Sequence, residues 1–195
     1  MAVLKARAHS DRDKELKRKR ILDSARSLFF DLGYQKTTVG LIMKQARMST
    51  GTFYLYFVNK IEIYKILMDE GIVLVQGMFA RELESLELDA KDKLVRLAQT
   101  YYRFYHDYPK YFEIIAFVTL NEEELRERES SISHTIDERN LELLGLVKGI
   151  IDEGNASGEF YVPRPWVAAN ILWGWLDGIF LLERRSNLRT VELSL

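Results

Sequence analysis

The chain has 195 residues, of which 47% are apolar and 29% are charged. This length suits one large domain or two small ones, and the apolar share is enough for a substantial core. The absence of cysteine excludes a disulfide framework and a thiolate metal site. The polar N-terminus lacks the apolar run of a signal peptide, so we expect a cytoplasmic protein.

The net charge of −1 conceals a strong asymmetry along the chain. Residues 1–60 hold 13 Lys or Arg and 5 Asp or Glu, whereas the remainder holds 15 and 24. A basic N-terminal region is typical of a surface that binds phosphates. Lys17–Arg20 forms a basic arm that leads into the first predicted helix. The arm would follow a DNA backbone, enter a minor groove, or remain a solvated, disordered tail.

The first predicted helix has a core face from Ile21 onward, because apolar residues recur from there at helical spacing. Gly33 comes directly after the last of them and suits the C-cap of this helix. The apolar stripe consists of Ile21, Leu22, Ala25, Leu28, Phe29 and Leu32.

Two further short helices are predicted between residues 37 and 60, joined by a tight turn. Thr37 or Thr38 can cap the first of them, because a threonine oxygen accepts a free backbone N–H at a helix start. Arg47–Ser49 forms the turn, and Ser49 is a second good N-cap. The inward face of the first short helix would consist of Val39, Ile42, Met43 and Ala46.

The second short helix would run over Ser49–Phe57, with Phe53 and Phe57 four residues apart on its core side. Asn59 then caps a third helix that begins at Lys60. This is the layout of a helix-turn-helix, which places a short helix in the DNA major groove. A plain helical hairpin without a ligand is the alternative.

The segment from Arg20 to Leu67 resembles the DNA-binding domain of the TetR family of bacterial transcription repressors. The order and spacing of the matching residues run through three helices without a gap. These residues are Ile21-Leu22, Ala25, Leu28-Phe29, Gly33-Tyr34, Thr37-Thr38-Val39, Ile42, Ala46, Ser49, Gly51-Thr52, Tyr54, Tyr56-Phe57 and Asn59-Lys60. Gly40, Met43 and Arg47 depart from the pattern, since the family usually has a polar residue, an alanine and a glycine there.

The resemblance implies which residues meet DNA. Base edges would be contacted by Thr50, Gly51, Tyr54 and Leu55, and phosphates would be held by Thr38, Tyr54, Tyr56 and Lys60. Arg47 and Ser49 in the turn complete the expected DNA-binding set. Two-fold symmetry of a dimer would make the operator nearly palindromic.

The remaining sequence predicts helices and a few connecting loops. A long helix follows from Lys60 to about Leu86, Asp89 caps the next, and Pro109 begins another. Asn121 caps a long helix that ends before a loop at residues 154–158. Pro165 opens a last helix to about Arg185. The chain stops after Thr190–Leu195, where the family usually has its final helix, so the protein is either short or trimmed.

Trp166–Leu182 is nearly continuous apolar sequence and is interpreted as a dimer seam. A buried core helix is the alternative. A membrane span is disfavoured because the stretch is short and contains Asn170 and Asp177. The residues expected at the seam are Trp166, Asn170, Gly174 and Gly178.

The C-terminal domain that contains this stretch is also expected to bind a small-molecule effector. Aromatic side chains could line an apolar pocket, although most aromatics at helical spacing belong to a core. The candidates are Phe79, Tyr101, Tyr102, Tyr105, Phe112, Phe117, Trp173, Trp175 and Phe180. Asp177, Arg103 and His106 are polar groups that could orient the ligand.

Catalysis finds little support, because the three histidines lie far apart and no nucleophile motif or phosphate loop is present. His134 and Glu138 have metal-ligand spacing, but two ligands do not make a site. No cofactor and no metal are expected.

We therefore expect an all-α protein with a DNA-binding domain and basic arm over residues 1–62 and a regulatory and dimerisation domain over residues 63–195. Its function would be that of a homodimeric, ligand-responsive repressor of transcription that binds double-stranded DNA and no membrane. A helical small-molecule carrier that does not bind DNA is the main alternative, and a helical enzyme using His106 or His134 is a third.

Overall fold

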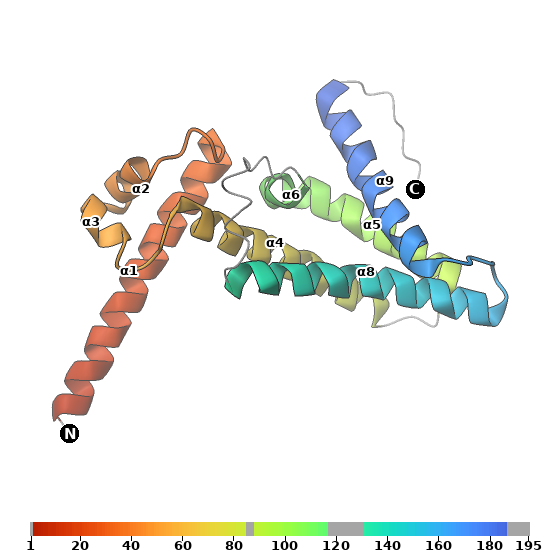
Figure 1. Cartoon of the computed structure of the whole chain (residues 1–195), viewed down its shortest axis with the longest axis horizontal. Coiled ribbons are helices and arrows are strands. Elements are labelled where there is room, and N and C mark those ends of the chain that lie inside the picture. The colour runs from red at the N-terminus through yellow and green to blue at the C-terminus, as the bar shows by residue number, and fades with distance from the viewer. Residues whose placement is uncertain (1, 85–87, 117–130, 187–195) are drawn as a thin grey trace. The chain divides into compact units, whose positions relative to one another are not determined.

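The computed structural model describes residues 2–84, 88–116 and 131–186, and every regular element within them is an α-helix (Figure 1). The all-helical class is therefore confirmed. The helices are α1 (Ala2–Leu32), α2 (Val39–Ala46), α3 (Thr50–Phe53), α4 (Lys60–Leu83), α5 (Ala90–Asp107), α6 (Pro109–Ala116), α8 (Ser131–Ser157) and α9 (Pro165–Ser186). They form two compact units, Met1–Leu67 and Met68–Leu195, so that α4 contributes to both.

In the first unit, α2 packs against the C-terminal half of α1, and α3 packs on α2 (Figure 1). Ile21, Ala25 and Phe29 are buried along α1, as their spacing predicted. Gly33 ends the helix with a φ of 78°. The Thr37 hydroxyl, which is fully buried, donates to the carbonyl oxygen of Gly33 at 2.9 Å and so fixes the connection to α2.

The basic segment Lys17–Arg20 is part of α1, so the disordered tail, one of the alternatives for this segment, is wrong. Leucine, lysine, arginine and glutamate dominate the sequence around it, and these residues favour a helix when no glycine or proline interrupts them. An ion pair of 2.6 Å between Lys17 and Asp13, one turn apart, is compatible with the same conformation.

The second unit is built around a cluster of aromatic side chains from α5, α6 and α9. Tyr101, Phe104, Phe112 and Phe180 are all fully or almost fully buried there. The helix starts agree with the sequence: the Asp92 N–H donates to Asp89 at 2.7 Å, and α6 and α9 begin at proline. α8 packs against α9 and against α5 (Figure 1).

Helix α8 continues to Ser157, so the loop predicted at residues 154–158 is wrong. Gly154 is needed for packing rather than for a turn, because a Cβ there would lie 2.1 Å from the Phe160 ring. The side chain of Asn155 exchanges two hydrogen bonds with the backbone of Val162, at 2.9 and 2.7 Å, and folds the following segment back onto α8. The turn is made by Gly158, whose φ is 78°.

Some predictions fall on other parts of the chain. Phe117 as a ligand contact and Asn121 as a helix cap both lie outside the described residues.

Candidate functional sites

Helix α2, the first helix of the helix-turn-helix, has the predicted cap and core. The Leu41 N–H donates to Thr38 Oγ1 at 3.2 Å, which caps α2. Its inward face is buried at Ile42, Met43 and Ala46 and half-buried at Val39. Met43, where the family usually has alanine, is accommodated with 1% of its surface exposed.

Arg47 ends α2 in the left-handed conformation, with a φ of 56° and a ψ of 47°. It is the one non-glycine residue with positive φ in the described part of the chain. The Met48 N–H donates to the Met43 carbonyl oxygen at 3.0 Å and closes the turn. The left-handed backbone costs an L-residue about 1–2 kcal/mol, so the turn carries local strain at Arg47.

The segment Thr50–Phe57, which we call the recognition segment, is less regular than the predicted helix over Ser49–Phe57. Regular helix covers Thr50–Phe53 only, and turns continue from there to Tyr56. Ser49 occupies the N-cap position, but its hydroxyl pairs with Thr52 Oγ1 at 2.8 Å instead of capping a backbone N–H. Threonine and glycine have low helix propensity, which accounts for the short helix.

The recognition segment is amphipathic in the way a groove-binding element requires. Phe53 and Phe57 are buried, with ring centroids 5.7 Å apart. On the other sides Thr50 and Gly51 are exposed, Tyr54 is 63% exposed and Leu55 is 80% exposed. Tyr56 is half-buried. Val58, which the sequence reasoning did not select, is also exposed because it follows Phe57 directly and points away from the core.

The side chain of Lys60 makes contacts within the protein that the sequence did not reveal. Its Nζ donates to the carbonyl oxygens of Tyr34 and Thr37, each at 2.9 Å, and lies 3.9 Å from the centroid of the Tyr34 ring. Lys60 therefore fastens the start of α4 to the connection between α1 and α2. Asn59 caps α4 as predicted, through a bond of 2.9 Å from the Glu62 N–H.

The second unit contains an apolar cavity of about 340 Å³ between α5 and α9. Four of the aromatic candidates, Phe79, Tyr101, Trp173 and Trp175, line it. The full lining consists of Phe79, Leu94, Leu97, Ala98, Tyr101, Val147, Leu172, Trp173, Trp175, Leu176 and Ile179. An apolar ligand, or the apolar part of a larger one, suits these walls.

The other aromatic candidates pack elsewhere. Tyr102, Tyr105 and Phe112 all contact the ring of Phe180, and the Tyr105 ring stacks on it at 4.9 Å. Phe112 and Phe180 are fully buried. In this conformation the four side chains form core rather than cavity wall, which is the alternative the sequence had left open.

One residue of the apolar wall, Tyr101, belongs to a partly buried polar pair. The Tyr101 hydroxyl donates to Asp177 Oδ1 at 2.6 Å and so ties α5 to α9. Burial raises the pKa of Asp177, while the bond from Tyr101 opposes that shift. Burial, followed by the charge of Asp177 and its hydrogen bond, raises the pKa of Tyr101 well above its ordinary value. Both groups therefore favour their neutral forms more than they would in water.

A second, more polar hollow of about 540 Å³ adjoins the first and shares Trp173 with it. Asp177 lines this hollow, whereas its hydrogen-bond partner Tyr101 lines the apolar cavity. Its other polar walls are Asp137, Asn140 and Asn170. Among the described residues that line either space, none is Lys, Arg or His.

Helix α9 exposes an apolar face in the single subunit. Of the predicted seam residues, Trp166, Asn170 and Gly174 are exposed and Gly178 is half-buried. The side-chain amide of Asn170 donates to the Trp166 carbonyl oxygen of the same helix at 2.8 Å. The larger residues of this face were not among the predicted seam residues, although their helical spacing was a signal that could have identified them. They are Val167, Ile171, Trp175 and Leu182.

By length and composition alone, residues Pro165–Arg184 would also pass for a membrane span, which is a weak criterion. In the described part of the chain, no group of three or more His, Cys, Asp or Glu side chains is placed to hold a metal ion.

Comparisons with known proteins agree on one family. Residues 21–65 match the profile of bacterial regulatory proteins of the tetR family. The fatty acid metabolism regulator protein of Bacillus subtilis (strain 168) is 31% identical over 155 residues, which cover 76% of this chain and 73% of that protein.

Two solved structures share the fold. The transcriptional regulator FadR from Bacillus subtilis, in complex with stearoyl-CoA, superposes with a TM-score of 0.65 at 24% identity and covers 86% of this chain and 89% of that one. AibR, in complex with isovaleryl coenzyme A and operator DNA, has a TM-score of 0.65 at 19% identity, with coverage of 85% and 86%.

Proposed function

Because this chain belongs to the TetR family of bacterial regulatory proteins, we propose that its regulatory unit binds an acyl thioester of coenzyme A and thereby releases DNA. The protein is a ligand-responsive transcription repressor with a helix-turn-helix. The identity of the effector, the residues that bind it, the residues that bind DNA and the dimer are parts of the proposal. The protein acts as a cytoplasmic regulator and not as an enzyme.

The exposed side of the recognition segment supports the DNA contacts. Tyr54 and Leu55 project from a segment whose opposite side is anchored by two buried phenylalanines. A rigid element with protruding side chains can enter the major groove without unfolding its support. Tyr54→Ala should therefore weaken specific binding at least tenfold. Tyr161→Ala, which removes an exposed tyrosine in the other unit, is the matched control and should bind DNA like the parent.

The apolar cavity supports an effector with an aliphatic chain. Two similar proteins carry acyl-CoA ligands in their solved structures, stearoyl-CoA in one and isovaleryl coenzyme A in the other. If a methylene occupies about the volume of a water molecule, roughly 30 Å³, a cavity of this size holds about ten carbons. A saturated chain of medium length is therefore the best match.

The polar pair at the wall supports a thioester over a free fatty acid. A carboxylate at the end of the chain would lie near Asp177, and no cation among the described lining residues would compensate its charge. Burying a charge without a partner costs several kcal/mol. A thioester carries no charge and so avoids this cost. The adjoining hollow has Asn140 and Asn170 in its wall, which could form hydrogen bonds with the amide groups next to the thioester in coenzyme A.

The apolar face of α9 supports a homodimer. Ile171, Trp175 and Leu182 are each more than 60% exposed in one subunit, which is unusual for large apolar side chains along one helix. Packing this face on a second copy would remove it from water and would bring two recognition segments to one operator.

Titration of the protein with decanoyl-CoA, followed by tryptophan fluorescence, tests the effector. We expect saturable binding that decanoate does not reproduce. Trp173→Phe, which retains an apolar ring, should keep binding, and Leu176→Asp in the cavity wall should abolish it. A protein that binds neither compound, or binds decanoate as well as decanoyl-CoA, would contradict this assignment. A carrier protein, the alternative function, would bind the thioester but would show no sequence-specific affinity for DNA.

A further inference from the structure

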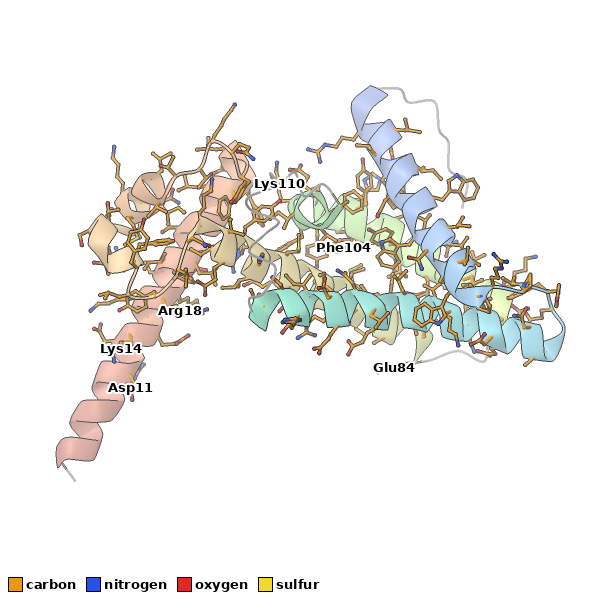
Figure 2. All side chains as sticks on the ribbon, in the orientation of Figure 1. Asp11, Lys14, Arg18, Glu84, Phe104 and Lys110 are labelled. Atoms are coloured by element: carbon orange, nitrogen blue, oxygen red, sulfur yellow. The ribbon has the colours of Figure 1, made fainter. Side chains whose placement is uncertain are left out.

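The N-terminal half of α1 is a helical extension with an excess of positive charge. Residues 11–20 comprise six Lys or Arg and three Asp or Glu, and all of these side chains are exposed except Arg18, which is half-buried. In Figure 2, Asp11, Lys14 and Arg18 follow one another along the part of α1 that extends past α2 and α3. The hydrophobic core of the first unit begins only at Ile21.

One face of this extension continues the face that packs on the helix-turn-helix. Ala25 and Phe29 are buried there, and Arg18 and Lys14 lie on the same side at spacings of seven and four residues. The guanidinium carbon of Arg18 is 5.1 Å from the centroid of the Phe57 ring, so a cation–π contact holds the extension against the end of the recognition segment.

A second lysine lies at the edge of the same face. Lys17 forms an ion pair of 2.6 Å with Asp13, and both side chains are about half exposed. This hydrogen bond and the Asp13 charge raise the pKa of Lys17, and the nearby Tyr56 adds a small contribution in the same direction. Lys17 is thus close to Tyr56, for which the family resemblance implies a phosphate contact. An exposed ion pair is worth little, so Lys17 can exchange Asp13 for another anion.

We propose that Lys14 and Lys17 contact backbone phosphates of the duplex that flanks the half-site, while Arg18 positions the helix through Phe57. This proposal rests on the proposed function, because it requires that the recognition segment enter DNA. Lys14 precedes Arg18 by four residues, which places it about 6 Å farther along the helix axis. Phosphates of one strand recur about every 3.4 Å along a duplex. The extension therefore reaches DNA outside the bases read by the recognition segment. It adds affinity without sequence preference.

Duplexes selected by the protein from a random library provide the probe. Binding is measured on a selected duplex with ten further base pairs on each side and on one trimmed to the half-sites, over a range of salt concentrations. We expect the parent to bind the long duplex more tightly. Lys14→Gln should lower the slope of log K against log salt by about 1 per subunit on the long duplex and should have little effect on the trimmed one. Lys17→Gln should behave in the same way.

Arg20→Gln is the matched control, because Arg20 has the same charge as Lys14 but lies on the opposite side of α1 from Arg18. Its salt slope should equal that of the parent, and circular dichroism should show the same helix content for all variants. Equal affinity of the parent for both duplexes, or equal slopes for Lys14→Gln and Arg20→Gln, would overturn the inference while the repressor function stood. A parent that selects no duplex would overturn both.

Discussion

The hydroxyl of Tyr101 and the carboxylate of Asp177, 76 residues apart in sequence, share a hydrogen bond of 2.6 Å between α5 and α9. Tyr101 lines the apolar cavity and Asp177 lines the adjoining polar hollow, so the pair lies between the two spaces. The pair ties α5 to α9, and burial raises the pKa of both groups.

Replacing Asp177 with asparagine should change the dependence of stability on pH. Burial raises the folded-state pKa of Asp177, so the stability it contributes is present below its unfolded pKa and is lost as pH rises through the folded pKa. An asparagine side chain at this position would not titrate and could still accept the bond from Tyr101. We expect the free energy of unfolding of Asp177→Asn, relative to the parent, to increase in urea titrations as the pH rises above the ordinary aspartate pKa of about 4. A difference that stays constant or falls over this range would show that burial does not raise this pKa.

Arg47→Gly should stabilise the DNA-binding unit. Glycine adopts the observed φ of 56° without the steric cost that arginine bears, although its greater freedom in the unfolded chain takes back part of the gain. We expect an increase of about 1 kcal/mol, measured by thermal melting. A lower melting temperature would mean that the arginine side chain contributes more than the strained backbone costs.

Gly154→Ala should destabilise the regulatory unit, since the added Cβ would meet the Phe160 ring at 2.1 Å. Overpacking of this kind costs about 1–3 kcal/mol. Gly77→Ala in α4 is the control, because nothing lies within 4 Å of its Cβ, and it should raise stability by about 0.5–1 kcal/mol. The free energy of unfolding of both variants can be measured by chemical denaturation. A change of the same sign in Gly154→Ala and Gly77→Ala would refute the packing explanation.

Gly174→Leu tests the dimer. Nothing lies within 4 Å of a Cβ at Gly174 in one subunit, so the larger side chain should leave the subunit folded and should disrupt only a close approach of two α9 helices. We expect sedimentation of the parent as a dimer and of the variant as a monomer at micromolar concentration. Gly77→Leu, also in open space but on α4, should remain a dimer. A monomeric parent would exclude the proposed assembly.

Local sequence signals predicted most of the first unit. The caps at Thr38, Asn59 and Gly33 and the spacing of Phe53 and Phe57 act over a few residues, and the structure reproduces each of them. The contacts of Lys60 with carbonyl oxygens more than twenty residues away depend on how the helices pack, and no local pattern encodes them.

The second unit was harder to predict because packing decides its details. Gly154 and Asn155 have the composition of a loop, but the fit of Phe160 on Gly154 keeps them in a helix. All of the aromatic residues of α5 have helical spacing, so the sequence could not separate Tyr101 at the cavity from Tyr105 in the core. Only the tertiary structure distinguishes these two roles.

The most direct test of the account is the affinity of the protein for a selected operator duplex with and without decanoyl-CoA, measured by fluorescence anisotropy. Because ligand and DNA are proposed to favour different conformations, each must weaken the binding of the other by the same factor. We predict that saturating decanoyl-CoA raises the dissociation constant for DNA at least tenfold, that decanoate does not, and that the duplex weakens decanoyl-CoA binding equally. An unchanged affinity for the duplex at saturating decanoyl-CoA would contradict the account.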